Sequence, residues 1–255
     1  MNYDCIRCET ENSVALITLN RPQVLNAMNH QLWIDLQDVL ETLCRDPAVK
    51  VLIITGEGRA FSSGADLKES KSRSPEAYRD YLEALQTVSR EIIRFEKPTI
   101  AAINGYALGS GYELALACEI RIAAEEALIG SPEANVSSSV TGGAFRLLQD
   151  LVGPGKASEL LFTAKNIDGR EAERIGLVNQ AVPLEDLLPT ARRMALDIAG
   201  NAAFSLKMMK KGLYKAREPM SMEALMTFEI EACLACVGTR ERLQAMSDFE
   251  SRKET

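Results

Sequence analysis

The chain has 255 residues, of which 46% are hydrophobic and 25% are charged, a composition typical of a globular protein with a substantial core. Its formal net charge of -7 argues against nucleic-acid binding as the main function. No apolar run approaches the roughly 18 residues of a membrane span, and the polar start "MNYDCIRCET" does not resemble a signal peptide. We therefore expect a cytoplasmic protein, or an organellar one whose transit segment has been removed.

The first half of the chain is predicted to alternate strands and helices. Strictly alternating apolar residues indicate a hairpin, apolar residues three and four apart indicate helices, and short continuous apolar runs indicate buried strands. The predicted elements are a β-hairpin over residues 5–20, a helix over 29–46, a buried strand over 49–58, a helix over 75–95 and a buried strand over 98–103.

The second half is predicted to be mostly helical. Short strands are expected over residues 119–124 and 127–130, and one late strand over 176–182. From Phe145 onward the remaining sequence has helical spacing, interrupted at glycine and proline. This order of elements predicts an α/β core followed by a helical C-terminal part.

Six cysteines and one histidine limit the metal chemistry. Cys5 and Cys8 form a C-x-x-C pair in a strand-like stretch, where positions three apart face opposite sides. Cys233 and Cys236 form another, with no histidine or further cysteine nearby. We expect packed, reduced thiols and no metal site. A single histidine, His30, leaves no basis for a catalytic triad or a histidine-based metal centre.

Two glycine-rich loops could donate hydrogen bonds to an oxygen that gains negative charge. They are "TGEGRAFSSGADL", residues 55–67, and "GYALGSGYELALAC", residues 105–118. Each presents backbone N–H groups beside small residues. In the second loop Ser110 and Glu113 lie on one side of a first helical turn, where the helix dipole adds positive charge. Such turns also simply join strands to helices, so the loops alone do not establish a catalytic site.

Two glutamates stand in apolar surroundings. Glu113 lies among Tyr112 and Leu114, and Glu133 follows Pro132 at the end of a short apolar strand. Burying a carboxylate is costly unless it has a task. Two such acids should have separated pKa values and can divide acid and base roles. The residues alone leave open whether the two acids meet in space.

Four segments together resemble the crotonase superfamily, also called the enoyl-CoA hydratase/isomerase family. They are "LNRPQVLNAMN", "GRAFSSGADLKE", "NGYALGSGYELALACEIRIAAEEALIGSPE" and "EAERIGLVNQAV", and the resemblance extends over about residues 5–200. It implies an α/β fold, a ClpP-like spiral of β-β-α turns over residues 1–200, with a helical trimerisation region over 201–255. It also implies a homotrimer or homohexamer.

The resemblance further implies the ligand and the site. The substrate is an acyl-CoA thioester, with coenzyme A as part of the substrate and no metal or redox cofactor. The oxyanion hole falls on the backbone N–H groups of Ser63 and Ser110, and Glu113 and Glu133 match the pair that flanks the water in hydratases. The implied contacts to CoA and the thioester are Val24, Ala60, Ser63, Gly64, Ala65, Asp66, Leu67, Gly109 and Ser110.

The implied activity is hydration of a 2-enoyl-CoA in acyl-CoA and fatty-acid metabolism, with Glu133 delivering a proton to the α-carbon. Family members that only shift a double bond generally lack the acid matching Glu113, so the presence of both acids favours a hydratase over an isomerase. The alternatives are a double-bond isomerase, a ring-acyl-CoA hydratase, a C–C hydrolase, or an RNA-binding relative without catalysis. A nucleic-acid or membrane partner is not expected.

Two segments near the predicted site have two readings each. Residues 134–148, "ANVSSSVTGGAFRLL", lack the proline that many hydratases have. The serines at 137–139 could solvate a polar or cyclic acyl group, or cap a helix that begins near Gly142, and capping is favoured. The polar residues 68–81 could close over the acyl chain or link into the next helix.

The basic run "SLKMMKKGLYKAR" also has two readings. Its lysines could contact CoA phosphates or form the solvated face of an amphipathic helix. The second reading is favoured, with Leu206, Met209 and Leu213 packing inward.

Overall fold

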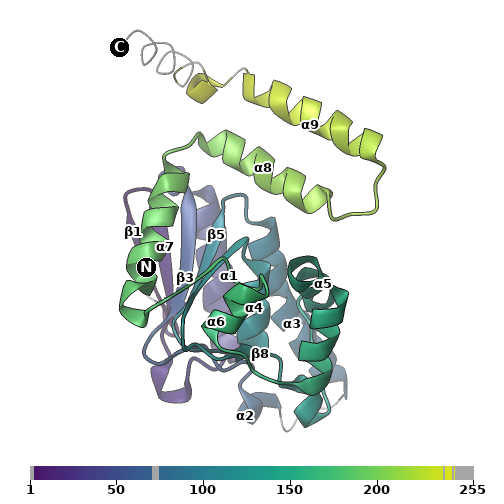
Figure 1. Ribbon diagram of the computed structural model, residues 1–255. Coiled ribbons are helices and arrows are strands. Elements are labelled where there is room, and N and C mark those ends of the chain that lie inside the picture. The colour runs from purple at the N-terminus through teal and green to yellow at the C-terminus, as the bar shows by residue number, and fades with distance from the viewer. Residues whose placement is uncertain (1–2, 71–74, 238, 243, 245–255) are drawn as a thin grey trace.

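Two β-sheets form the centre of the computed structural model, which describes residues 3–70, 75–237, 239–242 and 244 (Figure 1). The larger sheet has the order β1-β2-β3-β5-β7-β9, antiparallel between β1 and β2 and parallel elsewhere. The smaller sheet, β4-β6-β8, is parallel. The strands are β1 (Ile6–Glu11), β2 (Val14–Leu19), β3 (Val51–Gly56), β4 (Ala60–Ser62), β5 (Thr99–Ile103), β6 (Tyr106–Leu108), β7 (Ile120–Ala124), β8 (Ile129–Gly130) and β9 (Gln180–Val182).

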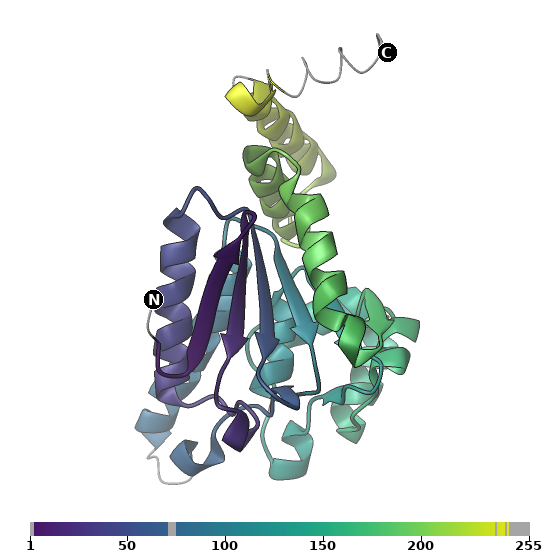
Figure 2. The same cartoon turned by 90° about the vertical axis from the view of Figure 1, so that its left-hand side faces the viewer.

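Helices cover both faces of the larger sheet, which explains its continuous apolar strands. Because side chains alternate along a strand, Val51 and Ile53 pack toward α7 while Leu52 and Ile54 pack toward α1 and α3. Figure 2 shows α1 and α7 on opposite faces of the sheet. The helices are η1 (Pro22–Val24), α1 (His30–Arg45), α2 (Leu67–Ser70), α3 (Pro75–Arg94), α4 (Ser110–Ala117), η2 (Glu133–Val136), α5 (Ala144–Thr163), α6 (Gly169–Arg174), α7 (Leu184–Ala199), α8 (Ala203–Lys215) and α9 (Met222–Val237).

The chain winds through three similar turns. In β3-β4-α3, β5-β6-α4 and β7-β8-α5, a strand of the larger sheet leads into a strand of the smaller sheet and then into a helix. This is the predicted spiral of β-β-α turns. The smaller sheet keeps the order of the larger one, so the segments that leave β4, β6 and β8 lie beside one another. The candidate site forms there.

The predicted elements are confirmed, with shorter ends. The hairpin, the helix over 29–46 and the strand over 98–103 are β1-β2, α1 and β5. The late strand covers only Gln180–Val182, because the amides of Leu177 and Val178 bond to the Ala172 carbonyl in a turn at the end of α6. Across the part of the chain that is described, no helix combines the length and apolarity needed to cross a bilayer.

Helix α8 turns a lysine toward the core and apolar side chains toward solvent, the reverse of what the sequence predicted. It lies beside α9 at one end of the molecule (Figure 1). Lys210 is only 5% exposed, whereas Met209 and Leu213 are 65% and 62% exposed. The prediction that Met209 and Leu213 pack inward is therefore wrong, and Leu206 is half-buried. The last residues of the predicted C-terminal region, 245–255, lie outside the described residues.

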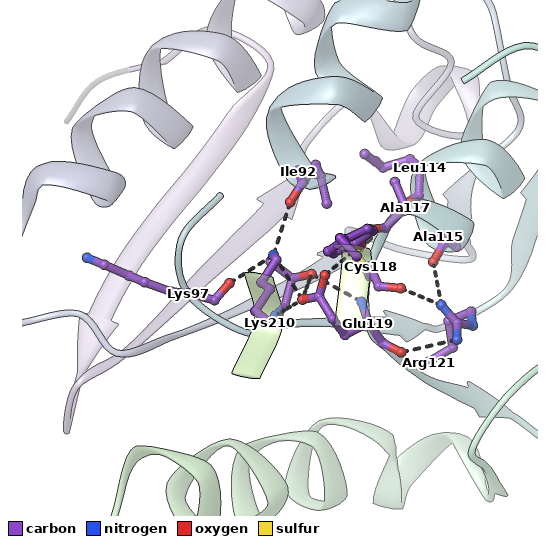
Figure 3. Close-up of polar contacts among 11 residues, drawn as sticks. Ile92, Lys97, Leu114, Ala115, Ala117, Cys118, Glu119, Arg121 and Lys210 are labelled. Carbon is purple, nitrogen blue, oxygen red and sulfur yellow. Dashed lines mark hydrogen bonds and ion pairs between the residues drawn. The ribbon is translucent and has the colours of Figure 1, made fainter. Parts of the chain in front are cut away.

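The half-buried acid Glu119 explains why α8 turns Lys210 toward the core (Figure 3). The Lys210 ammonium lies 3.0 Å from Glu119 Oε2 and donates to the carbonyls of Ile92 and Lys97 at 3.1 Å each, so its three donors are all paired. Burial lowers the pKa of Lys210, and the Glu119 charge opposes that shift. The Tyr214 hydroxyl donates to Glu119 Oε1 at 2.8 Å. This cluster attaches α8 to the core through charge rather than through apolar packing.

Replacing Lys210 by Met should be strongly destabilising, because Glu119, whose side chain is only 16% exposed, would lose its cation. We expect the free energy of unfolding to fall by about 3–5 kcal/mol in urea denaturation at fixed protein concentration. The matched control is Lys211→Met, which removes an exposed pair with Glu96 and should cost less than about 1 kcal/mol. Equal losses for the two variants would contradict an anchoring role for Lys210.

Candidate active site

A pocket of about 680 Å³ opens where the segments after β4, β6 and β8 meet. Its walls also include residues of α3 and the end of η1. Most of the residues expected from the sequence line it together. They are Val24, Ser63, Gly64, Ala65, Asp66, Leu67, Gly109, Ser110, Glu113 and Glu133.

The two glycine-rich loops touch each other through their backbones. A β-carbon on Gly64 would lie 2.8 Å from the Leu108 carbonyl oxygen and 3.4 Å from the Ser110 nitrogen. Gly64 also has a φ of +99°, which side chains disfavour. Glycine at this position therefore permits the contact that brings the amides of both loops to one pocket.

The first loop offers a different amide from the one expected. The Ser63 N–H donates to the Leu25 carbonyl at 2.9 Å, so the prediction that it forms part of the oxyanion hole is wrong. Two residues on, the Ala65 N–H has no hydrogen-bond partner among the described residues, and Ala65 lines the pocket. The Gly64 carbonyl of the same peptide group accepts from the Met28 amide at 2.8 Å, and the next amide, that of Asp66, donates to the Met28 carbonyl at 3.0 Å. These bonds hold the Ala65 amide in place.

The second loop places the amide of Ser110, the other predicted donor, at the pocket. Ser110 is the first residue of α4, and Gly109 before it has φ 52° and ψ −124°. Within the described structure the Ser110 N–H has no acceptor, as expected for the first turn of a helix. The positive end of the helix dipole lies at the same place. An oxygen that gains negative charge would be stabilised there.

Ala60 does not line the pocket, contrary to expectation. It is fully buried in β4, and its carbonyl accepts a hydrogen bond from Asn26 Nδ2 at 2.7 Å. The buried Asn26, which the sequence analysis did not single out, also accepts from the Ser62 hydroxyl at 2.8 Å through its carbonyl. Asn26 thus ties η1 to β4 and supports the first loop from behind.

A second missed residue is Arg21. Its guanidinium lies 3.1 Å from Asp66 Oδ2, also donates to the Ala27 carbonyl, and lines the pocket. Asp66 is therefore a paired, structural carboxylate at the pocket edge. Arg21 belongs to the motif "LNRP" and Asp66 to the motif "GAD". The two motifs are far apart in the sequence, so the sequence does not show that these residues pair.

The two glutamates meet at the pocket. Glu113 is 3% exposed, and both of its carboxylate oxygens accept hydrogen bonds from Thr141, one from the amide and one from the hydroxyl at 2.8 Å. Glu133 accepts a hydrogen bond from the Ser131 hydroxyl, and its Oε1 lies 2.8 Å from where a β-carbon on Gly109 would stand. Burial raises the pKa of Glu113, the Thr141 hydrogen bonds lower it, and the Glu133 charge raises it.

The serine-rich segment does not cap a helix. Helix α5 has Gly143 as its N-cap, with no side-chain capping bond, so the favoured capping reading is wrong. Ser137 ends η2 in a left-handed conformation, and Ser138 and Ser139 line the pocket. Lys68 and Tyr81, the two ends of the polar segment 68–81, also line it, while residues 71–74 lie outside the described structure.

The cysteines and the histidine stand apart from the pocket. All six cysteines are free thiols. In the described portion of the chain, no three His, Cys, Asp or Glu side chains are grouped so that they could hold a metal ion. His30 begins α1 and its amide donates to Glu69 at 3.0 Å.

The raised pKa of Glu113 predicts a stability that depends on pH. Below pH 4.5, the ordinary pKa of the group, the acid is protonated in both the folded and unfolded states. As pH rises through the folded-state pKa, the native protein must ionise a buried carboxyl and loses stability relative to a neutral side chain. Glu113→Gln should therefore match the wild type in Tm at about pH 4 and exceed it at about pH 8.

The measurement is calorimetry of both proteins across this pH range. Glu173→Gln, a change of an exposed glutamate on α6, is the control and should leave Tm unaltered throughout. A Tm difference between wild type and Glu113→Gln that stays constant with pH would refute the ionisation cost.

Comparison with known proteins agrees with this geometry. Residues 9–255 match the family described as "Enoyl-CoA hydratase/isomerase". The chain is 38% identical to crotonyl-CoA hydratase of Syntrophomonas wolfei, covering 99% of this chain and 98% of that one. It is 37% identical to short-chain-enoyl-CoA hydratase of Clostridium acetobutylicum, over 99% and 97% of the two chains.

The fold agrees as well. The crystal structure of an enoyl-CoA hydratase from Bacillus anthracis superposes with a TM-score of 0.94 at 32% identity, covering 98% of this chain and 97% of that one. The spiral of β-β-α turns is thus a crotonase fold, and the chain belongs to the enoyl-CoA hydratase/isomerase family.

Proposed function

We propose that this protein is an enoyl-CoA hydratase, which adds water across the conjugated double bond of a 2-enoyl-CoA and reverses the reaction on a 3-hydroxyacyl-CoA. One observation carries the proposal: Glu113 and Glu133 line the same pocket as the amides of Ala65 and Ser110, which have no acceptor among the described residues. The names of the relatives that match over nearly the full chain support the same reaction.

The two amides act on the thioester carbonyl. Hydrogen bonds from Ala65 and Ser110 polarise this carbonyl, which makes the β-carbon of the enoyl group electrophilic. The same bonds strengthen as negative charge collects on the oxygen in the enolate. Each such donor is worth about 3–4 kcal/mol of transition-state stabilisation.

The two acids act on the water. Glu113 and Glu133 accept hydrogen bonds from one water molecule and orient its oxygen toward the β-carbon. As the C–O bond forms, Glu133 takes one water proton and passes it to the α-carbon, where the enolate electron pair forms the C–H bond. Both carboxylates return to their starting state, and the thioester carbonyl is restored.

A double-bond isomerase is the second candidate of the same family. Moving a double bond needs one group to carry a proton between two carbons, and no water. The hydrogen-bonded Glu113 beside Glu133 favours hydration, because it supplies a second acceptor for water. The pocket lining is mixed, with the apolar side chains of Leu82 and Leu85 and the polar side chains of Ser138 and Ser139.

The reaction as proposed requires no metal or redox cofactor. Proton transfer is assigned to the carboxylates and charge stabilisation to the amides, and coenzyme A arrives as part of the substrate. We also assign the protein to the cytoplasm, since six free thiols suit a reducing compartment. No nucleic-acid or membrane partner enters the proposal.

We assign the helices α8 and α9 to subunit contacts in a homotrimer or homohexamer. Large apolar side chains stand exposed on both helices, and a groove between them has a mainly apolar lining. A surface of this kind favours burial against another protein surface. The exposed residues are Met209, Leu213, Met222, Met226, Ile230, Leu234 and Val237.

The proposed reaction is tested with crotonyl-CoA in water enriched in heavy oxygen. The wild type should bleach the conjugated absorbance and give a 3-hydroxyacyl-CoA that contains the heavy oxygen. Glu133→Gln should lose about 10²- to 10⁴-fold in kcat while still binding CoA esters. Binding of the enoyl ester without uptake of water by the wild type would overturn the hydratase assignment, and full turnover by Glu133→Gln would overturn the role of that acid.

The oxyanion hole is tested by removing one amide hydrogen. Proline is tolerated at the first position of a helix but has no N–H, so Ser110→Pro should keep the fold of α4 and lose the donor. We expect kcat to fall about 10²- to 10³-fold. Ser110→Ala keeps the amide and should remain close to wild type, and a similar loss in both variants would argue against the backbone role.

A further inference from the structure

One loop residue makes two hydrogen bonds to the buried acid. The Thr141 amide donates to Glu113 Oε1, and the Thr141 hydroxyl donates to Glu113 Oε2 at 2.8 Å. Each carboxylate oxygen thus has one protein donor and keeps a lone pair for a further partner. Thr141 itself lines the pocket beside Glu113.

The loop that carries Thr141 is held tightly against the catalytic helix. The Thr141 carbonyl accepts a hydrogen bond at 2.9 Å from the amide of Ala144, the first residue of α5. Gly142 has a φ of +59°, and a β-carbon there would lie 2.7 Å from Ser89 Oγ and 3.4 Å from Glu113 Cβ. The position of Thr141 is therefore set by packing against α3 and α4.

The electrostatics of Glu113 depend on this residue. Burial is the largest influence and raises its pKa, and the charge of Glu133 on η2 acts in the same direction. The loop contributes only Thr141 as an opposing group, and α3 presents the uncharged Ser89 at the loop contact. Donors to both oxygens favour the ionised form over the neutral acid.

We propose that Thr141 is a positioning residue, whose hydroxyl and amide together stabilise the ionised form of Glu113 and aim its free lone pairs into the pocket. The inference rests on the proposed hydration, in which Glu113 accepts a hydrogen bond from the attacking water. A hydratase with an apolar side chain at this position would need a higher pH to ionise the same acid.

The kinetic test compares the pH profiles of Thr141→Val, Thr141→Ala and Thr141→Ser. Losing the hydroxyl raises the Glu113 pKa, so the acid limb of kcat/KM should move up by about one pH unit in the Val and Ala variants. Serine restores the hydroxyl and should restore the profile. Thr163→Val, which removes an exposed hydroxyl bonded to the Glu159 carbonyl on α5, is the matched control.

A second readout does not require activity. The carboxyl carbons of protein labelled with ¹³C-glutamate are titrated by NMR, and the Glu113 signal is identified by its loss in Glu113→Gln. The Glu113 midpoint should rise in Thr141→Val and return in Thr141→Ser. An unchanged midpoint overturns the role of Thr141, whereas a wild type that titrates as expected but adds no water overturns only the proposed function.

Discussion

The parallel pairing of β4 with β6 is the constraint on which the site depends. This pairing places the segments after both strands side by side, and Gly64 lets their backbones touch. The amides of Ala65 and Ser110 then lie at the same pocket. A donor built from backbone costs little reorganisation when charge develops, because the sheet holds it in place before the substrate arrives.

Helix α4 links this pocket to the rest of the molecule. Its first turn carries Ser110 and Glu113. The charged side chains of Glu119 and Arg121 follow its last turn (Figure 3). The Arg121 guanidinium donates to the carbonyls of Ala115 and Cys118 at the C-terminal end of the helix. The Tyr214 hydroxyl, which donates to Glu119, also lies 3.2 Å from the Ala117 carbonyl oxygen. Contacts at the C-terminal end of α4 therefore help to hold its N-terminal turn at the pocket.

Buried charge has two different uses in this fold. At one end of α4, Lys210 and Glu119 neutralise each other, and their ion pair attaches the C-terminal helices to the core. At the other end, Glu113 has hydrogen-bond donors but no cationic partner among the described residues, and burial raises its pKa. The first arrangement holds the C-terminal helices to the core, and the second leaves a carboxyl group of raised pKa at the pocket. Similar residue types serve structure or chemistry according to what faces them.

Local patterns in the sequence determined the strands, the helices and the family. Alternation along β1 and β2, the apolar runs of β3 and β5, and the spacing of Ser110 and Glu113 depend only on residues near one another in the chain. Tertiary structure alone decided which amide of the first loop can bind a ligand. The Leu25 carbonyl accepts the Ser63 N–H, whereas the Ala65 N–H has no acceptor among the described residues. Tertiary structure also decided that Lys210 faces inward, since Glu119 on a distant segment supplies the charge that makes burial of an ammonium favourable. Hydrogen bonds and ion pairs between distant segments have no local periodicity, so no sequence pattern could have revealed them.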